Sequence, residues 1–167
     1  MKSLRLAILV VFSAFALAAL CIQANAITVA VSNVCPNLAG TYVNCHATAM
    51  AAIFPSTIQI GQNGNDYQVA ETFSDGTGSN SQVIPGAPPV SETYNDPQVG
   101  KIITTSQTLC EKGQLVTNVT TVQQGQTFYE NTIMSPTAAG LQLQMWLAEP
   151  NPHPTTAPDA VLTCSRY

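Results

Sequence analysis

Basic side chains are scarce in this 167-residue sequence, which has five lysines and arginines against nine aspartates and glutamates. A nucleic-acid-binding protein needs a lysine and arginine footprint to displace counterions from phosphates, and docking on anionic lipid needs one too. The sequence therefore predicts no nucleic-acid partner and no electrostatic docking on lipid. Because 46% of the residues are hydrophobic, a disordered chain is also excluded.

The sequence also lacks the motifs that mark most catalytic and metal centres. It has no His-x-x-x-His pair, no Gly-x-Ser-x-Gly elbow and no phosphate-binding glycine loop. Its two histidines, His46 and His153, are expected to be solvated, as are Glu71, Glu111 and Glu130 in or beside predicted strands. We therefore expect no catalytic residue, no metal site and no cofactor.

Residues 1–26 have the pattern of an export signal peptide. Two basic residues precede an apolar run at 7–20, and Ala24 and Ala26 are the small residues that signal peptidase needs before Ile27. Cleavage there leaves a single domain at 27–167, with a formal net charge of −6 and no transmembrane segment.

Two alternatives to cleavage remain open. An uncleaved anchor helix is one, although the apolar run is short for a membrane span of about 20 residues. The other is a lipoprotein acylated at Cys21, although Leu20 is not the small residue that acylation motifs place before the cysteine.

The even number of cysteines after the signal peptide predicts two disulfides and an oxidising compartment, periplasmic or extracellular. The favoured pairing is Cys35–Cys45, which closes a short loop, with Cys110–Cys164. The alternative is Cys45–Cys164, which would join the first and last strands of a closed barrel. The absence of a Cys-x-x-Cys motif argues against a redox or zinc site.

Threonine-rich segments with alternating apolar residues predict β-strands. The clearest hairpin joins 57–60 to 67–73 through the turn at Asn63-Gly64. The segment at 141–148 places four apolar side chains on one face. Further strands are expected at 40–44, 101–110, 115–122, 127–134 and 160–167, with a strand or lead-in at 27–32 and one short helix within 46–54.

Two segments are expected to be loops. Residues 75–97 are rich in glycine, serine, asparagine and proline, and predict long connections around a short edge strand at 82–84. Residues 149–158 contain four prolines and predict a stiff, irregular loop. About eight strands with short turns then predict an all-β fold, an antiparallel up-and-down β-barrel or a sandwich.

The triplet Gly40-Thr41-Tyr42 resembles the start of a lipocalin-like (calycin) β-barrel. That family has a Gly-x-Trp near the first strand, and a basic residue of the last strand packs over the aromatic ring. Tyr42 stands at the tryptophan position here, and Arg166 would be its barrel-closing partner. The resemblance covers 35–167, and it implies an internal cavity for a small apolar molecule and no catalytic residues.

Two functions follow from these observations. The first is non-catalytic binding of a small apolar ligand inside the barrel, where the aromatic and apolar residues either fill a core or line a pocket. The expected ligand-binding residues are Tyr67, Val69, Phe73, Phe128, Leu143 and Met145. The alternative is a protein-binding module or enzyme inhibitor that acts through the loops 75–97 and 149–158.

Overall fold

The computed structural model describes residues 34–151 and 154–167. The predicted signal peptide, Cys21, the predicted strand at 27–32 and His153 lie outside these ranges.

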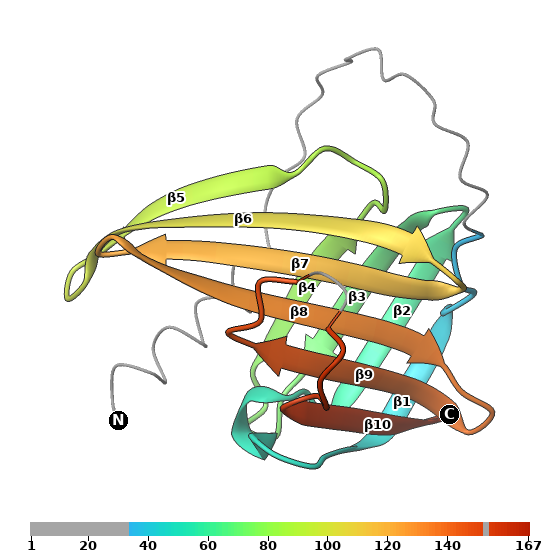
Figure 1. Ribbon diagram of the computed structural model, residues 1–167. Helices are drawn as coiled ribbons and strands as arrows, with labels where there is room; N and C mark the ends of the chain where they lie inside the picture. The colour runs from blue at the N-terminus through green and yellow to red at the C-terminus, as the bar shows by residue number, and fades with distance from the viewer. Residues whose placement is uncertain (1–33, 152–153) are drawn as a thin grey trace.

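Ten antiparallel strands form one sheet (Figure 1). The strands are β1 (Gly40–Ala47), β2 (Thr57–Asn63), β3 (Asp66–Thr72), β4 (Gly78–Val83), β5 (Val90–Asp96), β6 (Gly100–Glu111), β7 (Gln114–Gln123), β8 (Gln126–Pro136), β9 (Gly140–Leu147) and β10 (Ala160–Arg166). Consecutive strands are neighbours except β4 and β5, and β1 also pairs with β10. The all-β, antiparallel up-and-down fold is therefore confirmed, with ten strands rather than about eight.

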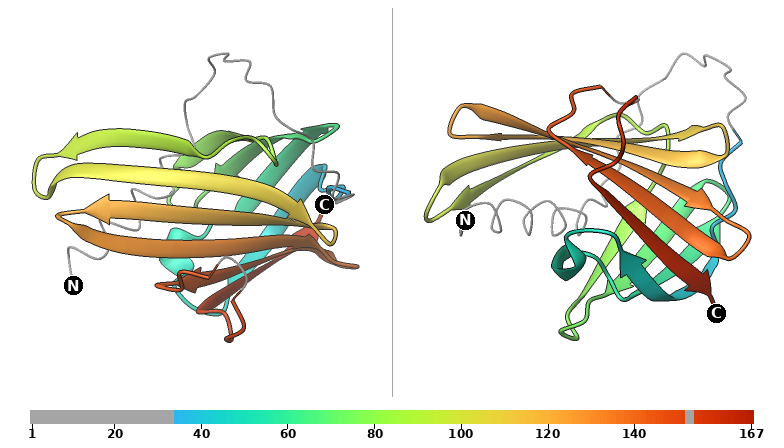
Figure 2. Two further views of the ribbon diagram at one scale, coloured as in Figure 1. Left: turned by 45° about the horizontal axis from the view of Figure 1, so that its top comes forward. Right: turned by 60° about the horizontal axis from the view of Figure 1, so that its bottom comes forward.

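The sheet does not close, because β4 and β5 are its two edges. It curls instead, so that the half containing β1–β4 lies across the half containing β5–β8 (Figure 2). One face of the sheet, the inner face, is enclosed between these halves. At the β5–β6 and β7–β8 turns, the ends of these four strands project past β1–β4.

The prediction of long connections at 75–97 is wrong. Most of this segment forms β4 and β5, joined by residues 84–89. Serine, asparagine and glutamine have low strand propensity, but the backbone of β4 pairs with β3 along its whole length, from Thr72 opposite Gly78 to Tyr67 opposite Val83. Tertiary pairing overrides local propensity here.

The short helix expected within 46–54 is a single 3₁₀ turn, η1 (Ala51–Ile53), because β1 continues to Ala47. The described residues of 149–158 contain no helix or strand, as the prolines predict.

The hydrophobic core fills one end of the inner face. Its side chains come mainly from β1, β2, β3, β9 and β10, and include Tyr42, Ile58, Tyr67, Leu141 and Met145, all nearly inaccessible to solvent. Each such side chain stabilises the fold by about 1.5–3 kcal/mol.

The segment 34–39 crosses this end of the core. Leu38 is fully buried, and the hydroxyl groups of Tyr42 and Tyr67 donate to the carbonyls of Leu38 (2.8 Å) and Pro36 (2.7 Å). The two tyrosines thus bury their rings without leaving a polar atom unsatisfied.

The favoured disulfide pairing is wrong, and the alternative Cys45–Cys164 bond is confirmed. β1 lies beside β10. A bulge after Val43, where Asn44 has φ 52°, turns the side chain of Cys45 toward the core, which is the side that Tyr42 also faces. The other bond joins Cys35 to Cys110 at the end of β6.

Two disulfides indicate an oxidising, exported environment. Within the ranges that the structure describes, no helix is long and apolar enough to cross a membrane.

Replacing Cys35 and Cys110 together by serine should lower the free energy of unfolding by about 2–5 kcal/mol, because the bond closes a long loop in the unfolded chain. Urea denaturation without reductant measures this loss. Non-reducing peptic digestion and mass spectrometry should recover the 35–110 and 45–164 links, and a 35–45 link would contradict the fold.

Candidate functional site

The structure separates the six residues that were expected to bind ligand. Tyr67, Val69, Leu143 and Met145 are packed into the hydrophobic core. Phe73 is half-buried just after β3, and Phe128 on β8 is 42% exposed. Four of the six therefore fill the core, and Phe128 is the most accessible of the set.

The structure places Tyr42 opposite Arg166 in the pairing of β1 with β10. The Arg166 guanidinium donates to the Ala39 carbonyl at 2.6 Å. Burial raises the pKa of Tyr42, and the positive charge of Arg166 partly offsets that rise. The two residues are thus paired near the centre of the sheet, and the packing of Arg166 over the Tyr42 ring stays a prediction.

Beyond the core, the inner face changes from apolar to hydroxyl-bearing side chains. Register with Cys110 and Leu115 places Thr108, Thr117, Thr104 and Thr121 on this face. The hydroxyls of Thr108 and Thr117 lie 2.9 Å apart, and those of Thr104 and Thr121 lie 3.4 Å apart. These pairs satisfy one another across β6 and β7.

Glu130 lies on the same face, between Val119 of β7 and Leu147 of β9. It is only 8% exposed, and burial raises the pKa of its carboxyl to about 7. This carboxyl forms no hydrogen bond or ion pair with another described residue, and because its oxygens are not completely buried they keep a small contact with solvent. The expectation of a solvated Glu130 is wrong, because β9 and β7 flank it with apolar side chains.

The sequence contained a signal for this position. Side chains alternate between the faces of a strand, so Glu130 shares a face with Phe128, which was expected to point inward. Glutamate side chains in strands usually lie on the solvated face, and that general preference predicted a solvated Glu130 in spite of this alternation.

The other predicted carboxylates lie elsewhere. Glu71 is on the inner face of β3, where burial raises the pKa of its carboxyl and a hydrogen bond from the Ser79 hydroxyl (2.9 Å) partly offsets the rise. Glu111 ends β6 on the outer face, and His46 is exposed on β1. Among the described residues, no three metal-ligating side chains come together.

The segment 149–158 packs on the outer face of β8 and β9. Asn131 donates its side-chain amide to the carbonyls of Glu149 and Asn151, and the Trp146 indole donates to the Thr156 carbonyl at 3.0 Å. Both anchoring side chains are buried. This predicted contact loop is therefore fixed to the sheet at both of its ends.

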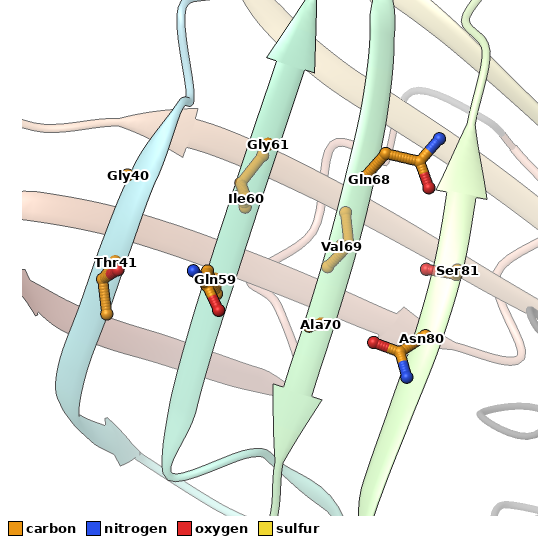
Figure 3. Close-up of a pocket in the computed structure, with 10 residues that line it drawn as sticks. All are labelled: Gly40, Thr41, Gln59, Ile60, Gly61, Gln68, Val69, Ala70, Asn80 and Ser81. Atoms are coloured by element: carbon orange, nitrogen blue, oxygen red, sulfur yellow. The ribbon is translucent and has the colours of Figure 1, made fainter.

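A hollow of about 350 Å³ lies on the outer face of β1–β4 (Figure 3). The side chains of Gln59, Gln68 and Asn80 surround the small residues Gly61 and Ala70. The sequence analysis did not single out these positions. The hollow is on the opposite face of the sheet from the core and from Glu130.

The unfavourable burial of Glu130 should make stability depend on pH. The folded carboxyl binds its proton more tightly than the unfolded one, so its contribution is complete below about pH 4.5 and is lost as the pH rises through 7. The loss amounts to about 3 kcal/mol.

Glu130→Gln should therefore be more stable than the wild-type protein at about pH 8 and should show a flatter pH profile in urea denaturation. Glu111→Gln on the outer face is the matched control, and it should keep the wild-type slope. A wild-type slope equal to that of Glu130→Gln would show that Glu130 is not desolvated.

Comparison with known proteins adds no relative to this description. No family model, no curated protein and no solved structure matches the chain.

Proposed function

We propose that this chain is an exported, periplasmic or extracellular, non-catalytic binding protein that holds a small molecule against the inner face at Phe128 and Glu130. The observation that carries the proposal is a largely buried carboxyl with no hydrogen-bond partner among the described residues, two residues from a phenylalanine that is exposed on the same face.

The apolar part of such a ligand would cover Phe128. The ring is 42% exposed although it points to the face that buries the core. Glu130 is the next inward-facing residue of β8 after Phe128, and Val119 and Leu147 flank it. An apolar ligand can therefore extend from Phe128 toward the core. Removing this surface from water contributes about 25 cal/mol for each Å².

The polar part of the ligand would meet Glu130. A buried polar group without a hydrogen-bond partner costs about 1–3 kcal/mol or more when it is charged. Glu130 is 8% exposed, so its carboxyl keeps little contact with water to offset that cost. A ligand that hydrogen-bonds to Glu130 would remove that cost.

This proposal keeps the internal ligand that a lipocalin-like barrel implies and changes its place. The core is stabilised by Tyr67, Val69, Leu143 and Met145. The ligand would bind at the other end of the inner face, which is more open and more polar. The proposed function is non-catalytic, because Glu130 has no second titratable group beside it on β7, β8 or β9.

A second candidate is protein binding at the connection between β4 and β5. Ile84 begins this connection and Val90 follows it, and the two are 51% and 44% exposed. Exposed apolar side chains beside the two free edges of a sheet suit a protein partner or a target enzyme better than a small molecule.

The test compares two arginine substitutions on neighbouring strands. Phe128→Arg should reduce the affinity for the neutral fluorescent probe N-phenyl-1-naphthylamine at least tenfold, because it places a charge at the site. Val122→Arg is the matched control, since Val122 is 37% exposed but lies on the outer face.

Both variants should retain the wild-type melting temperature within a few degrees. Equal binding of the probe by wild type and Phe128→Arg would overturn the inner-face site. Loss of binding in Ile84→Arg instead would favour the β4–β5 connection.

A further inference from the structure

We infer that the ligand is cationic, a small amphiphile whose ammonium group pairs with Glu130 while its apolar part covers Phe128. This inference rests on the proposed function and names the chemical class of its ligand.

The charges on the inner face carry the argument. Register places Glu71 of β3, Glu92 of β5 and Glu130 of β8 on this face. Arg166 is the only base that the described strands direct to it, and its guanidinium is held at the Ala39 carbonyl at the far end of the core. A concave surface lined by charge of one sign raises the local concentration of the opposite ion.

The bases elsewhere on the described strands do not neutralise this face. Lys101 on β6 is exposed on the outer face, and Lys112 is exposed in the turn between β6 and β7. His46 is exposed opposite Thr163 on the outer side of β10. A cation that enters the inner face therefore meets carboxyl groups without a competing charge from these strands.

Among the described residues, the immediate surroundings of Glu130 contain no group that could take the place of a cation. On the described elements beside it, Val119, Leu147, Phe128 and Thr132 share its face, and none of them titrates. Leu147, which pairs with Glu130, donates its amide to the Asp159 carboxylate at 2.7 Å. This group adds negative charge and provides no counter-ion.

An organic cation suits the site better than a metal ion. The three inner carboxyls come from separate strands, and no group of three metal-ligating side chains forms in the described residues. A single carboxylate next to an exposed aromatic ring suits an alkylammonium, which can gain both an ion pair and an aromatic contact. Burial raises the pKa of Glu130 in the free protein, and pairing with a cation would lower that pKa again, because a nearby positive charge favours the ionised carboxyl.

Isothermal titration calorimetry with octylamine and octan-1-ol tests the inference. The two probes have the same alkyl chain, and octylamine is charged at both about pH 8 and about pH 5.5. Since only ionised Glu130 pairs with the amine, octylamine should bind about 30-fold more weakly at the lower pH. Octan-1-ol should bind equally at both pH values, and less tightly than octylamine at about pH 8.

Glu130→Gln should weaken octylamine binding at least tenfold at about pH 8 and remove its pH dependence, whereas the outer-face control Glu111→Gln should leave both unchanged. If octan-1-ol binds as well as octylamine, the cationic ligand is overturned and the proposed function stands. If octylamine binds more tightly at the lower pH, Glu130 acts as a donor and the inference is also overturned. If neither probe binds the wild-type protein, the proposed function itself fails.

Discussion

The missing hydrogen bonds between β4 and β5 determine how this protein buries its core. A sheet closed into a barrel encloses its inner face by backbone pairing, but here the two edges are free and side-chain packing must hold the halves together. The Cys35–Cys110 bond attaches the segment 34–39 to β6, and hydrogen bonds to Pro36 and Leu38 attach it to the buried tyrosines. This crossing segment therefore links the two halves at the apolar end.

The same arrangement divides the inner face into two regions. Near the crossing segment, Tyr42, Ile58 and Leu141 are almost completely buried. Toward the projecting ends of β5–β8, threonine hydroxyls pair with one another and Glu130 has no described partner. The proposed function places ligand binding at this second end, whereas the apolar side chains of the first end stabilise the fold.

Much of the fold was predictable because it depends on local patterns. The alternation at 141–148 and the Asn63-Gly64 turn predict their strands directly. The segment forming β4 was not predictable, because its serines, asparagine and glutamine have low strand propensity and their backbone is held by pairing with β3. The Cys45–Cys164 bond was not predictable either, because it depends on the contact of β1 with β10 and on the bulge at Asn44. The inward direction of Glu130 follows from the strand alternation that it shares with Phe128, whereas its burial also depends on Leu147 of β9, which pairs with it.

The central claim is that Glu130 is a desolvated carboxyl on a ligand-facing surface, and ¹³C NMR titration of glutamate side chains tests it most directly. The account predicts that one glutamate, identified by its absence in Glu130→Gln, titrates near pH 7 in the free protein. Saturating octylamine should move that titration to a lower pH. A Glu130 carboxyl that titrates near its ordinary value of 4.5 and does not respond to octylamine would contradict the account.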